Sequence, residues 1–406
     1  MITKITLPTA SILVVACLLL SCNNGSIRSQ QRDQVRANVA RKEAVVKEEH
    51  LSANKIKDVS LKEPTDLTAV QFLDDDNAWL GGKEKVFKTQ DGGRTWQQVK
   101  LEVLPGSSVR RINFVSPMIG WIIFQRSADT AINYQLNHFR VLHTVDGGNT
   151  WSLQYDGNEA AVTDLLFTDK RNGWITGLKF GGLSPYRYTY LILHTKDGGV
   201  HWEDVSPSLI KLKLPGKEQM GDRINEAAMG VTAAPSSSAV KILTSENEIF
   251  TTADDARSWE TPVVIDNKSE HAGIRRFGSK ADNHLWFITS TNGREGTWST
   301  FEIEQNQNAW SMFMFQEIYL TDVVPLNDRH FIASGFVFDA NKDNDSARQA
   351  VLLHTPDDGQ TWSVIYRDKK IPKFNSLHFL SPGTILAVGD NGSALRLHID
   401  SLLQTK

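Results

Sequence analysis

Two pairs of adjacent arginines are candidates for binding chemistry in this chain. Arg110-Arg111 and Arg275-Arg276 stand in stretches that we expect to be inner β-strands. Because side chains alternate between the two sides of a strand, we expect one arginine of each pair to face a central channel. We therefore predict that these four arginines contribute to partner binding.

Further basic and aromatic side chains stand in segments that we expect to be long loops on one face of the fold. A mixed surface of this kind suits a protein partner or an anionic glycan. The candidates are Arg126, Tyr134, Arg140, Tyr186, Arg187, Tyr188 and Arg223. The alternative is that these loops only cover the edge of the fold.

Carboxylates offer a second chemistry, because two of them suffice for glycoside hydrolysis. Asp164, Glu226 and Asp322 lie in expected inner strands, yet nothing singles out a pair among 47 Asp and Glu residues. The sequence also lacks a glycine-rich phosphate loop, a Ser-His-Asp spacing and a metal-ligand cluster. We expect no catalytic residue, no metal and no cofactor. A glycoside hydrolase or carbohydrate-binding protein, acting on a polysaccharide or sialoglycan, remains the alternative function.

A repeated motif positions these residues. The pattern Thr-x-Asp-Gly-Gly-x-Thr-Trp ends at Trp96 and Trp151, and variants of it end at Trp202, Trp259 and Trp362. In such a tight turn the aspartate accepts backbone N–H groups, the glycines supply positive φ and the tryptophan fills the gap between sheets. A residue repeated in every unit cannot define one unique site, so we predict a structural role. The residues with this role are Asp91, Trp96, Asp146, Trp151, Asp197, Trp202, Asp254, Trp259, Asp357 and Trp362.

The repeat indicates seven units. Trp310 ends a further unit in which only the spacing of the motif survives. With it, the closing tryptophans recur at intervals of 51 to 57 residues, and ten of the 11 tryptophans occupy two repeating positions. The last unit lacks its outer strand, and Ile56–Leu61 aligns with the outer strand of the first unit. We predict an all-β fold over residues 54–402. It is a seven-bladed β-propeller with four-stranded antiparallel blades, closed by this N-terminal strand in the last blade.

The motif resembles the Asp-box, or BNR, repeat of β-propeller proteins. Over residues 55–400 the order of strands, aromatic-Gly motifs and Asp-boxes is similar to the photosystem II assembly and stability factor family. That resemblance implies an assembly scaffold with an arginine-rich patch that binds a protein partner. Sialidases share the repeat, but they have six blades and a Phe-Arg-Ile-Pro signature that this sequence lacks.

The N-terminus is typical of an exported protein. The apolar run Ile12–Leu20 is too short to span a bilayer and fits a signal peptide over residues 1–21. It ends in Leu19-Leu20-Ser21-Cys22, which resembles a bacterial lipobox, so we predict cleavage before Cys22 and lipidation of its thiol. The alternative is an ordinary signal peptide with a chance cysteine. Residues 22–53 are polar and charged, and we predict that they form a solvated tether.

These features predict a lipoprotein of the cell envelope. Asn23 is not the acidic residue associated with inner-membrane retention, so we expect the outer membrane, on its periplasmic or surface face. The expected partners are the membrane, through the lipid, and an envelope protein, with a glycan as the alternative. A net charge of −3 argues against nucleic acid. We favour a protein-binding or complex-assembly scaffold, acting through the loop face of the propeller, over an enzyme.

Overall fold

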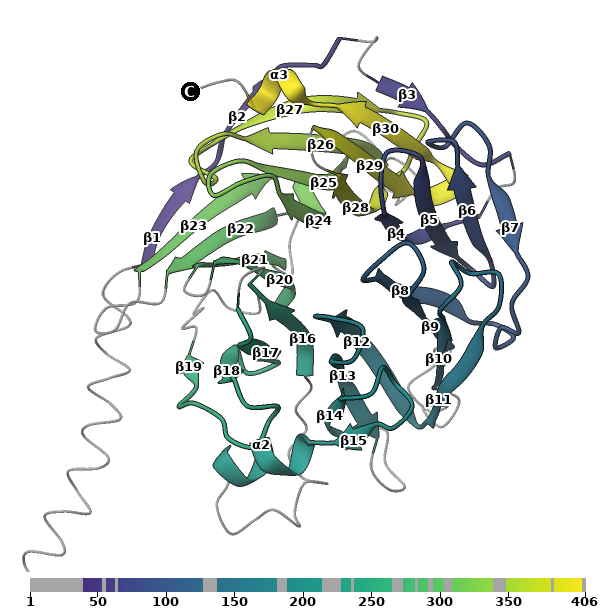
Figure 1. The fold of residues 1–406 in the computed structure, drawn as a ribbon. Helices are drawn as coiled ribbons and strands as arrows, with labels where there is room; N and C mark the ends of the chain where they lie inside the picture. The colour runs from purple at the N-terminus through teal and green to yellow at the C-terminus, as the bar shows by residue number, and fades with distance from the viewer. Residues whose placement is uncertain are drawn as a thin grey trace, which may run out of the picture.

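Seven β-sheets make up the computed structural model (Figure 1). It describes residues 39–52, 56–62, 65–126, 137–180, 188–213, 228–234, 237–264, 273–281, 284–290, 295–302, 309–338, 348–380 and 383–403. Five sheets have four strands and two have five. We number the sheets I to VII in chain order.

The first four sheets each use one continuous stretch of chain. Sheet I contains β4 (Leu67–Phe72), β5 (Asn77–Gly82), β6 (Val86–Gln90) and β7 (Gln97–Val99). Sheet II contains β8 (Ser108–Phe114), β9 (Gly120–Arg126), β10 (His138–Thr144) and β11 (Ser152–Asn158). Sheet III contains β12 (Ala160–Phe167), β13 (Gly173–Phe180), β14 (Tyr188–Thr195) and β15 (Glu203–Asp204). Sheet IV contains β16 (Ala228–Ala233), β17 (Val240–Thr244), β18 (Glu248–Thr252) and β19 (Val263–Val264).

The last three sheets each add a strand from the N-terminal part of the chain. Sheet V contains β20 (Gly273–Ala281), β21 (His284–Ser290), β22 (Glu295–Glu302), β23 (Ala309–Gln316) and β1 (Val39–Glu43). Sheet VI contains β24 (Ile318–Pro325), β25 (Phe331–Phe338), β26 (Arg348–Thr355), β27 (Thr361–Asp368) and β2 (Val45–Glu48). Sheet VII contains β28 (Phe374–Leu380), β29 (Thr384–Gly389), β30 (Ala394–His398) and β3 (Ile56–Asp58).

The sheets stand around a common centre, with the first strand of each on the inner side (Figure 1). The middle strands are buried along most of their length, as in β9 and β29, because neighbouring sheets cover both of their faces. The apolar clusters accordingly combine residues of two adjacent sheets. One of them joins Leu67 and Leu80 of sheet I to Leu386 and Val388 of sheet VII, the two ends of the series.

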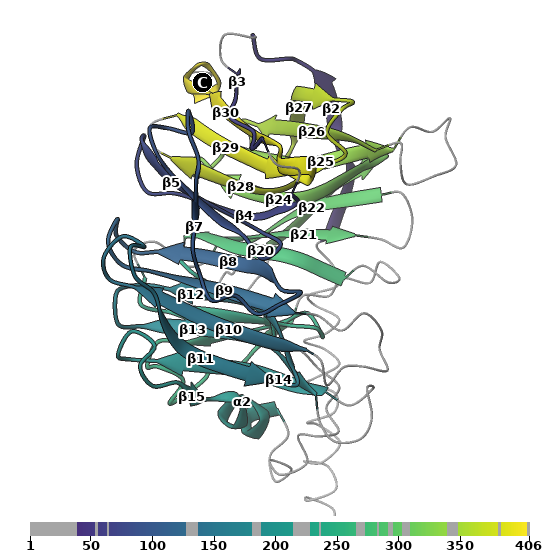
Figure 2. The same ribbon diagram turned by 90° about the vertical axis from the view of Figure 1, so that its right-hand side faces the viewer.

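Within the described residues, two short α-helices lie outside the sheets (Figure 2). Helix α2 (Ser206–Lys213) follows the short strand β15 and inserts the fully buried Leu209 between sheets III and IV. Helix α3 (Asp400–Leu403) follows β30 at the C-terminal end of sheet VII. Within the described part of the chain, no helix has the length and apolarity needed to cross a membrane.

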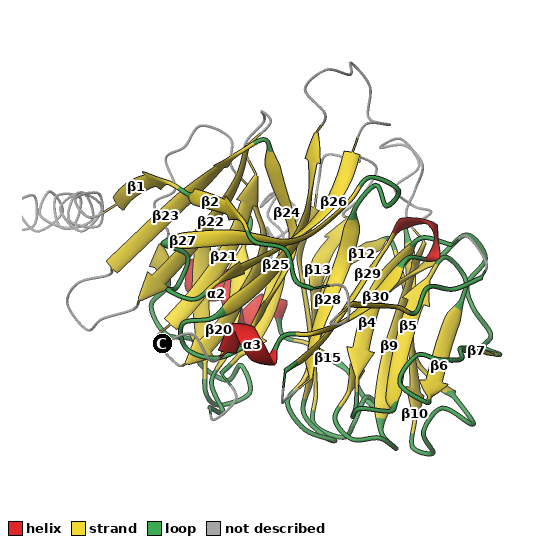
Figure 3. Ribbon diagram, turned by 90° about the horizontal axis from the view of Figure 1, so that it is seen from above, coloured by secondary structure: helices red, strands yellow, loops and turns green. Residues whose placement is uncertain are grey.

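Each described Asp-box turn follows the third strand of its unit, and its carboxylate lies inside the turn. Loops and turns are green in Figure 3. In sheet II, Thr144 Oγ1 and the Thr150 backbone N–H both donate to Asp146 Oδ1, at 2.8 and 2.9 Å, and Thr150 Oγ1 donates to Oδ2 at 2.6 Å. The same hydrogen bonds surround Asp91, Asp254 and Asp357. In the turns of sheets I, II and IV they lower the pKa of the aspartate to about 2. These oxygens are therefore engaged within the turn.

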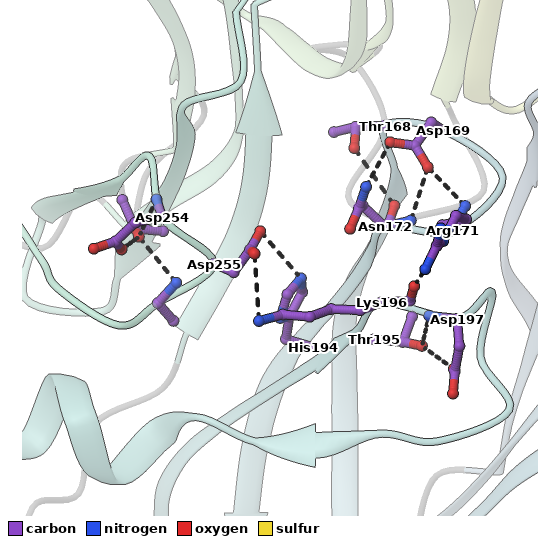
Figure 4. Close-up of polar contacts among 12 residues, drawn as sticks. Thr168, Asp169, Arg171, Asn172, His194, Thr195, Lys196, Asp197, Asp254 and Asp255 are labelled. Atoms are coloured by element: carbon purple, nitrogen blue, oxygen red, sulfur yellow. Dashed lines mark hydrogen bonds and ion pairs between the residues drawn. The ribbon is translucent and has the colours of Figure 1, made fainter.

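The box turn of sheet IV keeps its shape without glycine and is joined to sheet III. Asp255 and Ala256 both have φ of 62°, where the other boxes carry at least one glycine. The Asp255 carboxylate lies 3.3 Å from Lys196 Nζ and 4.0 Å from His194 Nε2 of β14 (Figure 4). The ion pair between Asp255 and Lys196 thus joins the box turns of sheets III and IV.

Tryptophans fill the spaces between sheets. Trp79 of β5 stacks on Phe114 of β8, with ring centroids 4.8 Å apart, and meets Trp151 edge-on at 5.7 Å. In the next interface Trp121 stacks on Phe167 and donates from Nε1 to the Gly198 carbonyl at 3.0 Å. These two inter-sheet contacts therefore combine an apolar surface with a fixed ring geometry.

The N-terminal segment differs from the expected tether over residues 39–48. Strand β1 pairs in parallel with β23 and β2 pairs in parallel with β27, on the outer edges of sheets V and VI. The side chains of β2 are all exposed, because the segment is held through its backbone and needs no apolar face of its own. Strand β3 then pairs antiparallel with β30, and the Val59 and Leu61 N–H groups continue this pairing. Residues 1–38 lie outside the described part of the chain.

We predict that Gly148→Ala destabilises the fold by about 2–4 kcal/mol. Gly148 has φ of 80°, and a Cβ there would lie 2.1 Å from Trp79 Cη2. Gly106→Ala is the matched control, because Gly106 has φ of 75° but its Cβ would meet nothing closer than 3.7 Å. Urea unfolding should show a loss of only about 1 kcal/mol for the control. Equal losses for both variants would contradict the packing role of Trp79.

Candidate protein-binding site on the inner strands

A β-bulge occurs at the same place in every inner strand. The register shifts by one residue at this place in all seven sheets. Such a bulge turns the extra side chain out of the regular alternation. The bulged residues are Thr68, Arg110, Thr163, Met229, Arg275, Thr321 and Asn375.

Four of the bulged residues tie their sheet to the next one. Thr68, Thr163 and Thr321 donate from Oγ1 to the carbonyls of Val109, Ala228 and Phe374, at 2.6 to 2.7 Å. Asn375 donates from Nδ2 to the Leu67 carbonyl at 2.9 Å, which joins sheet VII to sheet I. Each acceptor is the residue just before the bulge of the following inner strand.

Arginines occupy the same bulge position in sheets II and V. Arg110 is exposed to solvent, yet protein around it lowers its pKa, and the neighbouring Arg111 adds to this effect. No carboxylate among the described residues forms an ion pair with Arg110. Its guanidinium is therefore available to an anionic group from outside the chain. Arg275 lies at the equivalent place in β20, and its side chain is outside the description.

In four of the seven sheets the residue after the bulge is charged: it is an arginine in sheets II and V and an aspartate in sheets III and VI. Arg111 Nε of sheet II lies 2.6 Å from Asp164 Oδ1 of sheet III, with the two side chains 19% and 20% exposed. Arg276 Nε of sheet V lies 3.9 Å from Asp322 Oδ1 of sheet VI. In both ion pairs the arginine belongs to the earlier sheet and the aspartate to the next one, which joins sheet II to III and sheet V to VI.

Asp322 is the most enclosed acid of this ring. Burial raises its pKa, while hydrogen bonds from the Leu377 N–H and the Ser376 hydroxyl, and the charge of Arg111, act in the opposite direction. Because Arg111 acts on Asp322 from sheet II, side chains of opposite sheets face a common centre. Nearby, His378 accepts a hydrogen bond from the Phe72 N–H at 3.1 Å, a second link between sheets VII and I.

These contacts argue against a pair of catalytic carboxylates. Asp164 is paired with Arg111, and Asp322 accepts three hydrogen bonds, from Ser376, Leu377 and Val323. Glu226, the third candidate, lies outside the described residues. The described residues also contain no group of three or more His, Cys, Asp or Glu side chains suited to a metal ion.

Comparison with known proteins agrees with this fold. The family model described as photosynthesis system II assembly factor YCF48 matches residues 131–276. The photosystem II assembly protein Ycf48 of Synechococcus sp. (strain JA-2-3B'a(2-13)) is 23% identical over 299 residues, which cover 58% of this chain and 85% of that protein. The chloroplastic photosystem II stability/assembly factor HCF136 of Oryza sativa subsp. japonica is 25% identical over 176 residues, 41% of this chain and 33% of that protein.

Solved structures of the same family share the architecture. A structure of YCF48 bound to D1 peptide superimposes with a TM-score of 0.58 at 20% identity, over 86% of this chain and 99% of the other. YCF48 from Cyanidioschyzon merolae gives 0.55 at 18% identity, over 85% and 98%. The chain is a photosystem II assembly factor-like β-propeller. The comparisons give no support to the glycoside hydrolase alternative.

The remaining residues expected at the site of this propeller lie apart from the inner ring or outside the description. Arg140 Nε pairs with Asp156 Oδ2 at 3.1 Å across β10 and β11, and His138 contacts the other oxygen. Arg126 ends β9, and Tyr188 begins β14, opposite Phe180. Cys22, Tyr134, Tyr186, Arg187 and Arg223 lie outside the described residues.

Sequence reasoning missed the partners of the two inner arginines in this propeller. The signal was present as a doubled pattern, in which a unit with Arg-Arg is followed by a unit with Thr-Asp. Arg110-Arg111 precedes Thr163-Asp164, and Arg275-Arg276 precedes Thr321-Asp322. His378 had no such signal, because its role depends on the meeting of the first and last sheets.

Acidification should destabilise this propeller below about pH 6.5. The buried His354 has its pKa lowered to about 4 by burial and by His330, whose Nδ1 lies 3.2 Å from its Nε2. An unfolded histidine titrates near 6.5, so between pH 6.5 and 4 the unfolded state binds a proton that the native state excludes. The contribution of His354 to the free energy of unfolding is thus fully present above pH 6.5. It is lost as the pH falls from 6.5 to 4, by about 2–3 kcal/mol.

Urea unfolding at pH 7 and pH 4.5 measures this effect. His354→Gln cannot titrate, so it should lose less stability between these two values than the wild type does. Equal losses of stability between pH 7 and pH 4.5 in the two proteins would contradict the role of His354 in the pH dependence.

Proposed function

We propose that this chain is a cell-envelope lipoprotein whose propeller binds a protein partner and helps to assemble or stabilise a membrane complex. Arg110 carries the proposal. It is an exposed cation without a carboxylate partner among the described residues, at a position where other sheets use the side chain for internal contacts. The structural neighbour solved with a D1 peptide supports a protein segment as the ligand.

We further propose that the seven sheets are the blades of a closed ring. Support comes from the two hydrogen bonds between the inner strands β28 and β4 of sheets VII and I, and from β3, which gives sheet VII its outer strand. A closed ring holds the inner residues at fixed spacing. The partner would approach the inner arginines Arg110, Arg111, Arg275 and Arg276 from the face that carries the loops after the second strands. Of the other predicted binding residues of units two and three, Tyr134, Tyr186 and Arg187 stand in the sequence between the second and third strands. Arg126, Arg140 and Tyr188 belong to the strands on either side of these segments.

The lipid anchor belongs to the same proposal. Cleavage before Cys22 and its acylation would leave residues 22–38 as the tether between the membrane and β1. Several acyl chains give stable attachment, whereas one chain gives only marginal binding. The scaffold would then act at a membrane surface, for which we propose the outer membrane.

We predict that Arg110→Gln lowers partner recovery about tenfold or more, because a charge-assisted hydrogen bond contributes about 1.5–3 kcal/mol. The measurement is co-purification from detergent-solubilised envelope with quantification of the recovered partner. Arg94→Gln is the matched control, because Arg94 is an exposed arginine in a box turn. Full recovery by Arg110→Gln, or no specific partner with the wild type, would overturn the proposal.

We also predict that Cys22→Ser moves the protein from the membrane fraction to the soluble fraction. Cys17→Ser is the control, because Cys17 lies within the predicted signal peptide and should leave anchoring unchanged. The measurement is fractionation after a high-salt wash, which removes proteins held by charge alone. Retention of Cys22→Ser in the membrane fraction would contradict lipidation at this residue.

A further inference from the structure

The outer strand of sheet II is a long edge that nothing in the described chain covers. The eight-residue outer strands β23 and β27 are paired with β1 and β2. The outer strands of sheets I, III and IV have only two or three residues. Strand β11 has seven residues, and within the described residues it pairs with β10 alone. Figure 1 shows β11 on the outer rim, across the ring from β1 and β2.

Strands β11 and β27 have the same local geometry. Each contains a bulge eight residues after its box aspartate, at Gln154 after Asp146 and at Ile365 after Asp357. Leu153 lies opposite Leu142, as Val364 lies opposite Leu353. The two outer edges can therefore be compared residue by residue.

The edge of β27 in sheet VI shows how the residues at such a bulge bind an added strand. The Glu49 N–H donates to the Val364 carbonyl at 3.0 Å, and the Leu51 N–H donates to the Ile365 carbonyl at 2.9 Å. The equivalent carbonyls in sheet II belong to Leu153 and Gln154. Outside the pairing of β10 with β11, no backbone N–H group of the described chain donates to either of them. The edge thus presents two adjacent acceptors to an incoming backbone.

The covered edge of sheet VI and the uncovered edge of sheet II also differ in the exposure of equivalent apolar side chains. Val364 is 0% exposed and shares a cluster with Ala44, the residue between β1 and β2. Leu153, its equivalent, is 52% exposed. An apolar residue of an incoming strand would remove this surface from water, as Ala44 helps to do in sheet VI.

Charge identifies what kind of strand fits. In sheet VI, Arg367 Nη2 lies 2.6 Å from Glu48 Oε1 of the N-terminal segment. In sheet II the equivalent residue is Asp156, ten residues after its box aspartate. Its carboxylate already contacts Arg140 and His138 of the neighbouring strand β10. A strand with Glu48 would meet this carboxylate in place of the Arg367 guanidinium, which disfavours this chain's own N-terminal segment. A basic residue at that position would donate to a further acceptor site of the Asp156 carboxylate.

We propose that the outer edge of β11 binds an extended segment of another protein in parallel orientation, with a basic residue facing Asp156 and an apolar residue covering Leu153. The segment donates two N–H groups to the carbonyls of Leu153 and Gln154, as Glu49 and Leu51 do in sheet VI. This surface lies on the outer rim and does not depend on the inner arginines, so it is separate from the proposed function.

A synthetic peptide with the sequence of residues 44–52 and the change Glu48→Lys tests the proposal by fluorescence anisotropy with the full chain. We expect saturable binding that Leu153→Lys weakens at least about tenfold. Val200→Lys is the matched control, because Val200 is also an exposed apolar residue, in the box turn of sheet III, and it should leave binding unchanged. The unaltered peptide with Glu48 should bind several-fold more weakly.

Hydrogen exchange provides a second measurement on the same complex. Bound peptide should slow amide exchange in residues 152–158 and leave β27 unchanged. No saturable binding at about 1 mM peptide would overturn the proposal. Binding that Leu153→Lys does not affect, or protection confined to β27, would overturn it as well, because the peptide would then be replacing β2.

Discussion

The whole structure depends on covering both faces of each sheet. The middle strands are apolar on both sides, so a single sheet in water would expose two apolar faces. Each sheet therefore needs a neighbour on either side, and the first and last sheets share one apolar cluster. Trp79 and Trp121 make these contacts specific, because each stacks on a ring of the following sheet. Inner residues on different sheets are positioned by this packing and by the few hydrogen bonds that cross it.

Much of the fold could be predicted from the sequence, because the repeat encodes it locally. The Asp-box spacing and the alternation of apolar residues mark the turns and strands, and the prediction of an all-β, photosystem II assembly factor-like propeller is confirmed. The strands β1 and β2 could not be predicted in this way. They dock through backbone hydrogen bonds on edges far away in the sequence, and their side chains carry no apolar pattern.

Part of the candidate site could also be predicted from local sequence. Arg110-Arg111 and Arg275-Arg276 stand out as residue types, and alternation within a strand suggested that one of each pair faces the centre. The bulge changes this expectation, because it places Arg110 out of alternation and directs Arg111 to Asp164. Local sequence does not reveal a bulge that depends on pairing with the second strand. The adjacent arginines therefore differ, one satisfied by the next sheet and the other open to a ligand.

The N-terminal segment has a consequence for biosynthesis. Strands β1, β2 and β3 are made first, but their partners are residues 310–314, 361–364 and 395–397. During synthesis this segment must wait, unpaired, while some 300 residues follow it, a delay on the order of tens of seconds at usual elongation rates. Sheets I to IV contain only nearby strands and can form in the meantime. The three strands can thus dock only in the order in which their partners are made: β1 first, β2 next and β3 last.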